Sequence, residues 1–176
     1  MRGAINITLV LLWCFGSGLV ADLDAQSLTA GVARVLINPP LNLPMAGYGA
    51  RQGVSQGVLD DLQAKVLVVG GKESSIAFVT MDLIGVFPDS QQQQLRSRVR
   101  DSVGIQDIVF ICSHTHSGPS LKNENPDTWQ KDLAERIGAA IEEAWKSRQP
   151  AKIGVGTGQV FIGHNRLYYK RCLLYT

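Results

Sequence analysis

Short apolar runs rich in β-branched residues alternate along this chain with two segments of helical periodicity. Strands interleaved with helices favour an α/β domain in which a mixed β-sheet is layered with helices. A glycine-rich turn at residues 70–73 predicts a hairpin between two of the runs. The predicted strands are residues 30–37, 62–69, 75–83, 107–112 and 151–161, and the predicted helices are residues 88–103 and 127–147.

The run at residues 107–112 constrains the sheet further. Ile108, Val109, Phe110 and Ile111 follow one another without polar alternation. A strand that is apolar on both sides is typical of a sheet covered on both faces. We therefore expect this run to be an interior strand.

Length, charge and cysteine content limit the domain organisation and the classes of partner. At 176 residues the chain is long enough for one domain of ordinary size, and no repeat, low-complexity tract or linker divides it. The formal net charge is +2 and the basic residues are scattered, so no nucleic-acid partner is indicated. Cys14, Cys112 and Cys172 fall in three different regions, so no disulfide framework can be inferred.

Residues 1–25 have the pattern of a secretory signal peptide. Arg2 supplies a positive start, residues 5–20 are mostly apolar, and Ala21 or Ala25 can precede the cleavage site. The alternative is a membrane anchor, but the apolar run is shorter than the roughly 20 residues that a spanning helix needs. We expect a mature chain that begins near Gln26 and is secreted or periplasmic.

Two histidines lie where the strand at residues 107–112 gives way to a turn. On an extended backbone, residues i and i+2 point to the same face, so His114 and His116 can converge on one metal or one reacting group. Neutral imidazole suits Zn²⁺, and a catalytic zinc needs about three protein ligands. The chain has one further histidine, His164. The alternative interpretation is a satisfied polar pair at the end of a strand.

Other polar or flexible residues surround this pair in the predicted sheet. Asp82 ends a neighbouring strand and would either orient an imidazole or cap the following loop. Ser117 lacks a Gly-x-Ser-x-Gly setting, so we expect its hydroxyl to bond the backbone rather than act as a nucleophile. Gly118 is expected to allow tight passage of the backbone under a metal. The long loop at residues 38–59, rich in proline and glycine, is of the kind that often carries function.

The run His114-Thr115-His116-Ser117-Gly118-Pro119 resembles that of the neutral/alkaline, non-lysosomal ceramidase family. The resemblance extends over about residues 30–166, because shorter segments occur in the family's order: Gly31-Val32-Ala33-Arg34, Met45-Ala46-Gly47-Tyr48-Gly49, Asp61-Leu62-Gln63-Ala64-Lys65, Val79-Thr80-Met81-Asp82-Leu83 and Asn165-Arg166. It implies that residues 26–166 are the N-terminal part of a catalytic domain. The family's activity is zinc-dependent cleavage of the N-acyl bond of ceramide, a membrane lipid, which gives sphingosine and a fatty acid.

The resemblance also implies roles for individual residues. His114 corresponds to a zinc ligand, and His116 to an active-site residue that positions water or substrate. Arg166 corresponds to a residue that contacts the substrate or the developing oxyanion, although a surface salt bridge is the alternative. His164 matches the family's second histidine ligand poorly and would serve only as a makeshift ligand.

The chain departs from the family at its C-terminal end. The family's remaining ligands, a His, a Glu and a Tyr, lie well beyond the Asn-Arg pair, and residues 167–176 form an atypical tail without such a set. We therefore expect a truncated chain, for which an inactive fragment or weak binding module is the alternative function. Another metallohydrolase is a further alternative. However, Ser117 and Pro119 do not fit the His-x-Asp-His continuation of metallo-β-lactamases, and the chain is too short for a barrel of about 250 residues.

Overall fold

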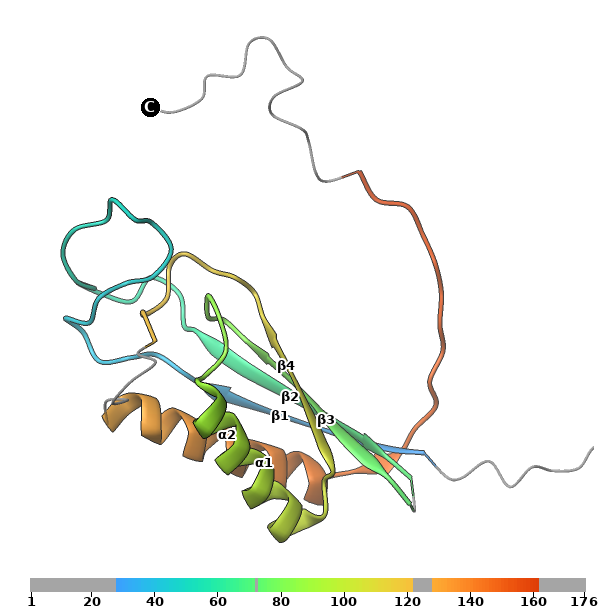
Figure 1. The fold of residues 1–176 in the computed structure, drawn as a ribbon. Helices are drawn as coiled ribbons and strands as arrows, with labels where there is room; N and C mark the ends of the chain where they lie inside the picture. Colours follow the sequence, from blue (N-terminus) through green and yellow to red (C-terminus); the bar gives the residue numbers. More distant parts are fainter. Residues whose placement is uncertain (1–27, 72, 122–127, 162–176) are drawn as a thin grey trace, which may run out of the picture.

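The computed structural model describes residues 28–71, 73–121 and 128–161. Its elements are β1 (Thr29–Leu36), β2 (Gln63–Gly70), β3 (Ser75–Met81), α1 (Asp89–Val103), β4 (Asp107–Cys112), α2 (Thr128–Lys146) and β5 (Gln149–Pro150) (Figure 1). The predicted signal peptide, His164, Arg166 and the C-terminal tail lie outside the described residues.

The strands form one mixed sheet in the order β4-β3-β2-β1-β5. Strands β1, β2 and β3 are antiparallel neighbours, and Gly70 opposite Ser75 closes the predicted hairpin between β2 and β3. Strand β4 is parallel to β3 and is reached through α1. Helix α1 ends at Gly104, whose left-handed φ of 72° lets its N–H bond the carbonyl of Arg100 at 3.0 Å. The predicted α/β architecture with a mixed sheet and two helices is therefore confirmed.

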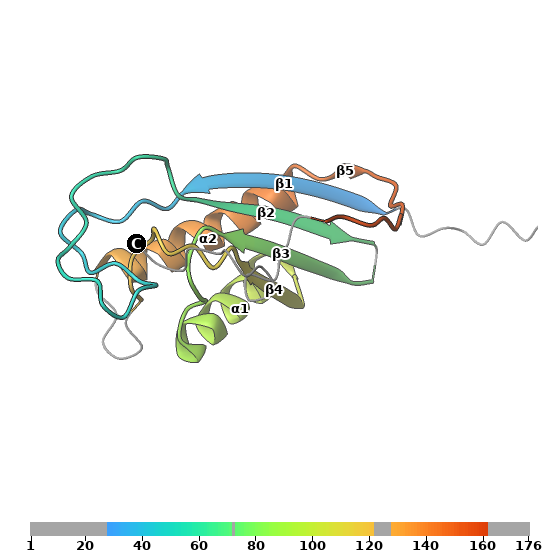
Figure 2. The same ribbon diagram turned by 90° about the horizontal axis from the view of Figure 1, so that it is seen from above.

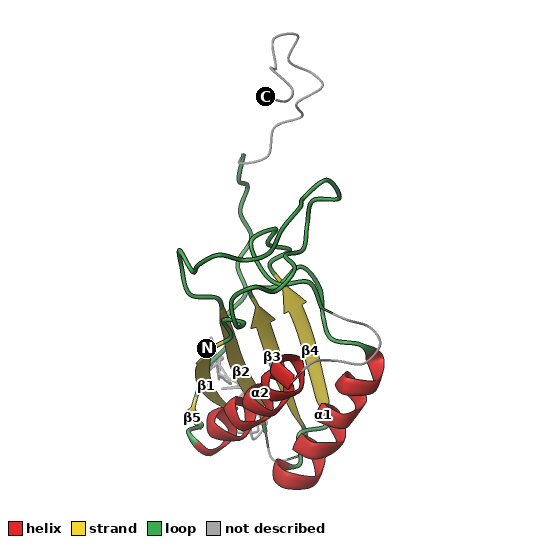
Figure 3. Ribbon diagram, turned by 90° about the vertical axis from the view of Figure 1, so that its left-hand side faces the viewer, coloured by secondary structure: helices red, strands yellow, loops and turns green. Residues whose placement is uncertain are grey.

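Both helices cover the same face of the sheet (Figure 3), and α2 lies along β1 and β2 (Figure 2). Their four-residue periodicity places apolar side chains toward the sheet, where they meet every second residue of the central strands. The approach of α2 to β1 is close at Gly31, where a Cβ atom would collide with the carbonyl oxygen of Ala144. The buried core includes Val66, Val68, Val79, Leu95, Val99, Leu133, Ile137 and Ile141.

Strand β4 lies at the edge of the sheet, so its prediction as an interior strand was wrong. Val109 and Ile111 are 38% and 46% exposed, because the described helices cover only the opposite face. The apolar run correctly indicated a strand. Its position was set by the crossover through α1, which leaves β4 outside β3. Within the described residues, one face of the sheet therefore carries exposed apolar side chains from β1, β2 and β4, among them Val32, Leu36 and Leu67.

The strand predicted at residues 151–161 is also wrong. Strand β5 contains only Gln149–Pro150, which pairs with the first two residues of β1, and the last contact of this edge is from the N–H of Ala151 to the carbonyl of Leu28. If this antiparallel register continued, residue 152 would face residue 27, which lies outside the described residues. The alternating apolar residues of this segment have no neighbouring strand to pair with in the described part of the chain, and Val155 is 94% exposed.

Strands β1, β3 and β4 run in the same direction, so the loops that follow them gather at one end of the sheet (Figure 3). These loops begin after Leu36, Met81 and Cys112. The third of them contains the His-Thr-His run. The fold therefore brings that run together with the long loop at residues 38–59, although β4 is not a central strand.

Candidate active site

His114 and His116 lie in the loop after β4, where the backbone is no longer extended. The strand ends at Cys112, and His114 has a left-handed φ of 57°. The extended backbone expected at these residues is therefore wrong, but the two imidazole rings are neighbours, with centroids 5.2 Å apart and planes inclined at 62°. His114 is exposed and His116 is half-buried. The pair is thus accessible from outside.

A backbone carbonyl orients the imidazole of His114. Its Nδ1 lies 3.0 Å from the carbonyl oxygen of Ile84, in the loop after β3. A carbonyl only accepts hydrogen bonds, so this contact selects the tautomer of the neutral imidazole in which Nδ1 carries the proton and Nε2 the lone pair. Histidines that bind metals are commonly held in this way, with one ring nitrogen donating to a carbonyl. The exposed ring of His114 can therefore offer Nε2 to a ligand.

Asp82 contacts the start of β2 rather than a histidine. Its Oδ2 accepts a hydrogen bond of 3.0 Å from the N–H of Gln63, and its own N–H donates to the carbonyl of Gln63 at 3.0 Å. This reciprocal pair fits the alternative in which Asp82 caps the loop after its strand. The group that orients the His114 imidazole is instead the carbonyl of Ile84.

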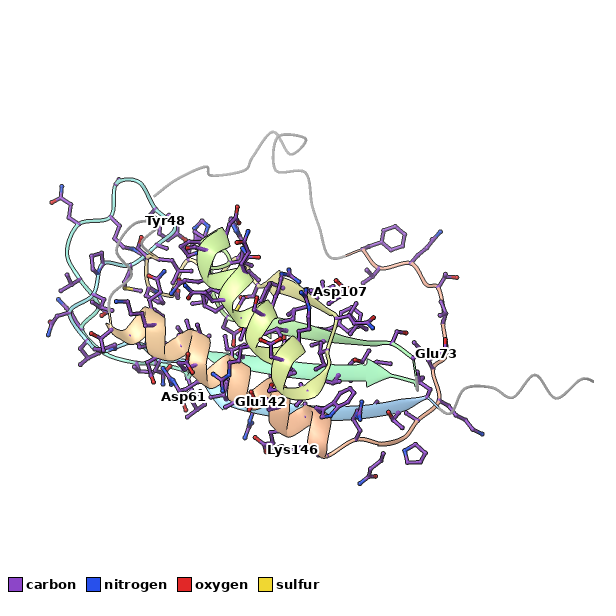
Figure 4. The ribbon with its side chains drawn as sticks, turned by 60° about the horizontal axis from the view of Figure 1, so that its bottom comes forward. Tyr48, Asp61, Glu73, Asp107, Glu142 and Lys146 are labelled. Atoms are coloured by element: carbon purple, nitrogen blue, oxygen red, sulfur yellow. The ribbon has the colours of Figure 1, made fainter. Side chains whose placement is uncertain are left out.

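Residues of the long loop hold His116 at the loop end of the sheet. Figure 4 shows Tyr48 at this end of the molecule and Glu73 at the other end. The ring of Tyr48 meets the His116 ring edge to face, with centroids 4.8 Å apart. Nη1 of Arg51 donates to the His116 carbonyl at 2.8 Å and to the Ala46 carbonyl at 2.9 Å. The sequence marked this loop as functional but gave no role to either residue. The Gly-Tyr-Gly segment was the available signal.

Gly47 fits closely against His116. It has a φ of +111°, and a Cβ atom there would lie 2.5 Å from Cβ of His116 and 2.8 Å from its Cα. No real Cβ contact is that short, so only glycine fits without displacing the histidine turn. Gly118 is different. A Cβ atom at Gly118 would meet the Asp82 oxygen and a Thr115 methyl at 3.4 Å, an ordinary contact. The tight passage expected at Gly118 is therefore found at Gly47 instead.

Backbone hydrogen bonds fasten the long loop to the turn. The N–H of Ala46 donates to the Gly118 carbonyl at 3.0 Å, and the N–H of Ser120 donates to the Pro44 carbonyl at 2.9 Å. Within the turn, the N–H of Ser117 bonds Oγ1 of Thr115 at 3.1 Å. Ser117 is thus part of a local turn, but the bond is made by its N–H, and the predicted bond from its hydroxyl to the backbone is not found among the described residues.

A cavity of about 730 Å³ lies beside the histidine turn. Neither imidazole lines it, and the turn contributes Ser113, Thr115, Ser117, Gly118 and Pro119. Its remaining walls come largely from the long loop and include Leu41, Leu43, Met45, Val58 and Leu59. The cavity is therefore a neighbour of the histidine pair and not the space into which the pair projects.

Within the described residues, no group of three or more His, Cys, Asp or Glu side chains is placed to hold a metal ion. Burial raises the pKa of the Cys112 thiol, which disfavours the thiolate form that binds zinc. His164 and Arg166, which the resemblance placed near the site, lie outside the described residues.

The fold resembles that of solved ceramidases. The structure of neutral ceramidase from Pseudomonas aeruginosa matches with a TM-score of 0.61 and 21% sequence identity over 72% of this chain and 23% of that one. A structure described as ceramidase complexed with C2 matches with a TM-score of 0.58 and 20% identity over 71% and 22% of the two chains.

No protein-family model and no curated protein sequence matches the chain. The structural matches cover 23% and 22% of the solved ceramidase chains, so this chain spans less than a quarter of their length. The resemblance first noted in the histidine run therefore extends to three dimensions, and the described residues have the fold of one part of a neutral ceramidase.

Proposed function

We propose that the histidine turn is part of the active site of a zinc-dependent amidase. The observation that supports this most is the His114 imidazole, which is exposed, oriented through Nδ1 by the Ile84 carbonyl and, within the described residues, without a hydrogen bond at Nε2. It opens the ceramidase-like run in a fold similar to that of neutral ceramidases. The proposed reaction is hydrolysis of an N-acyl amide, and the proposed substrate is ceramide, which yields sphingosine and a fatty acid.

In this proposal each residue has one task. His114 binds Zn²⁺ through Nε2, and His116, with its ring centroid 5.2 Å away, hydrogen-bonds the attacking water or the substrate. When bound, Zn²⁺ would lower the pKa of a water molecule and polarise the amide carbonyl. Arg166 donates to the oxyanion that develops on the carbonyl oxygen. Asp82, Ser117 and Gly118 support the turn and its surrounding loops.

The zinc site needs more ligands than the described residues supply. A catalytic zinc takes about three protein ligands, of which the described pair gives His114, assisted by His116. His164 is the candidate for a further, makeshift ligand within this chain. We therefore expect the 176-residue chain to bind zinc weakly. Strong binding and turnover on a membrane lipid would require the additional His, Glu and Tyr ligands that the resemblance implies.

Zinc titration calorimetry tests the ligand assignment. His114→Ala should abolish zinc binding, and His164→Ala should weaken it. Ser120→Ala is a matched control, because it removes an exposed hydroxyl from the same loop and leaves its backbone hydrogen bond intact. If the His114→Ala protein binds zinc as tightly as the unaltered chain, the assignment is wrong.

Hydrolysis of a fluorescent ceramide and of shorter N-acyl amides separates the enzyme from its alternatives. In a chain that also carries the His, Glu and Tyr ligands implied by the resemblance, Arg166→Ala should leave zinc binding unchanged and slow hydrolysis by about 100-fold or more, which is the usual cost of losing an oxyanion donor. Zinc binding without hydrolysis of any amide would favour the weak binding module. Hydrolysis of short amides but not of ceramide would favour a metallohydrolase with another substrate.

We also propose that residues 1–25 are a signal peptide and that residues 26–166 belong to the catalytic domain. The support is the positive start, the apolar run and the small residues before Gln26. Mass spectrometry of exported protein should find a chain that begins near Gln26. An intact Met1 on cytoplasmic protein would contradict this proposal.

A further inference from the structure

Arg51 joins three groups around His116. Its Nη1 donates to the carbonyl oxygens of Ala46 and His116, at 2.9 and 2.8 Å, and its guanidinium lies over the ring of Tyr48, 4.8 Å from the ring centroid. Tyr48 in turn meets the His116 ring. We propose that Arg51 is a positioning residue that fixes the orientation of the His116 imidazole through the His116 carbonyl and through Tyr48.

The contacts restrict His116 from both its backbone and its ring. A charged donor makes a stronger hydrogen bond to a carbonyl than a neutral one does, so Arg51 holds the His116 backbone firmly against the long loop. The ring centroid of Tyr48 lies 4.8 Å from that of His116, and the ring centroid of His114 lies 5.2 Å from it. Gly47 closes on Cβ of His116. Because Arg51 also contacts Tyr48, its loss would release both restraints.

The geometry distinguishes this role from that of a general loop brace. A brace would need only the hydrogen bonds between the loops, and the backbone pairs of Ala46 with Gly118 and of Ser120 with Pro44 already supply them. The guanidinium instead lies over the Tyr48 ring, which itself meets the ring of His116. The proposal rests on the proposed function only for the importance of His116, because the positioning itself can be measured without zinc or substrate.

The test is nuclear magnetic resonance of the labelled 176-residue chain, which reports the nuclear Overhauser effect between the Tyr48 and His116 rings. Arg51→Met removes the charge and the donors, and it should reduce this effect to less than half. Arg51→Lys keeps a cation and should restore part of it. Arg96→Met is the control, because Arg96 also stacks on an aromatic ring, that of Phe110 at 5.4 Å, but this ring belongs to strand β4 and not to the loops around His116. It should leave the ring-to-ring effect unchanged.

Two outcomes overturn the proposal. One is a folded Arg51→Met protein whose Tyr48 to His116 effect equals that of the unaltered chain, and the other is an equal loss in Arg96→Met. If Arg51→Met does not fold, Tyr48→Ala replaces it, and the His116 ring signals should then broaden, whereas unchanged signals would refute the link through Tyr48. A lost ring contact in Arg51→Met, together with no hydrolysis by a chain that carries the full ligand set, would refute the proposed function and leave the positioning role intact. Where turnover is measurable, Arg51→Met should lower kcat by up to about 100-fold with little change in KM.

Discussion

Replacing Gly47 by alanine should strain the site more than any other single methyl group in the long loop. The residue has a φ of +111°, which L-residues adopt at a cost of about 1–2 kcal/mol. In addition, the new Cβ would lie 2.5 Å from Cβ of His116, so that atom must move by about 0.9 Å to reach an ordinary contact of 3.4 Å. Forcing an extra methyl group into a packed region costs about 1–3 kcal/mol. The sum is about 2–5 kcal/mol.

Two other glycines of the same loop separate these contributions. Gly53 also has a positive φ, of +89°, but open space around a Cβ atom, so Gly53→Ala should show the backbone cost of about 1–2 kcal/mol alone. Gly49 has open space and no positive φ, so Gly49→Ala should range from no change to a gain of about 1 kcal/mol. The free energy of unfolding should therefore fall in the order Gly49→Ala, Gly53→Ala, Gly47→Ala.

Urea denaturation measures the three free energies, and the ring-to-ring nuclear Overhauser effect of Tyr48 and His116 reports the local displacement. Gly47→Ala should weaken this effect, whereas the other two variants should preserve it. Equal stabilities of the Gly47→Ala and Gly53→Ala proteins, together with an unchanged ring contact, would refute the close fit between the long loop and the histidine turn.

Two further predictions concern the core and the edge strand. Leu133→Ala should lower the free energy of unfolding by about 2–5 kcal/mol in urea denaturation, because Leu133 is fully buried, whereas Leu59→Ala should change it by less than about 0.5 kcal/mol because Leu59 is 98% exposed. Cys112 should react with iodoacetamide at pH 8 more slowly in the folded protein than in urea, because burial raises the pKa of its thiol. A chain carrying Cys14→Ser and Cys172→Ser isolates that rate, and equal rates in the two states would contradict the burial.

Local patterns were sufficient to predict most elements of the fold. Periodicity located both helices, and the apolar β-branched runs located β1 to β4, because these signals depend on neighbouring residues. Sheet order depends on contacts between distant segments. That is why β4 was expected in the interior and residues 151–161 were expected to pair. An apolar run shows that burial is favourable but does not show whether a covering layer is available.

The candidate site was predicted in part for the same reason. The His-Thr-His run was visible because its residues are adjacent, and its neighbourhood with the long loop followed once the strand directions were known. Arg51 lies 65 residues from His116, and its role depends on hydrogen bonds to two carbonyls, which no side-chain pattern records. The Ile84 carbonyl that orients His114 is a backbone group and equally invisible in sequence.

The left-handed backbone of His114 affects how its substitutions should be interpreted. At a φ of 57°, asparagine and glycine are tolerated better than alanine, since the short amide side chain or the missing Cβ relieves the steric conflict. His114→Ala therefore removes the imidazole and strains the turn at once, whereas His114→Asn removes the imidazole and largely preserves the backbone. If both variants lose zinc but only the alanine variant disturbs the signals of His116, the chemical and conformational contributions of this one residue can be separated.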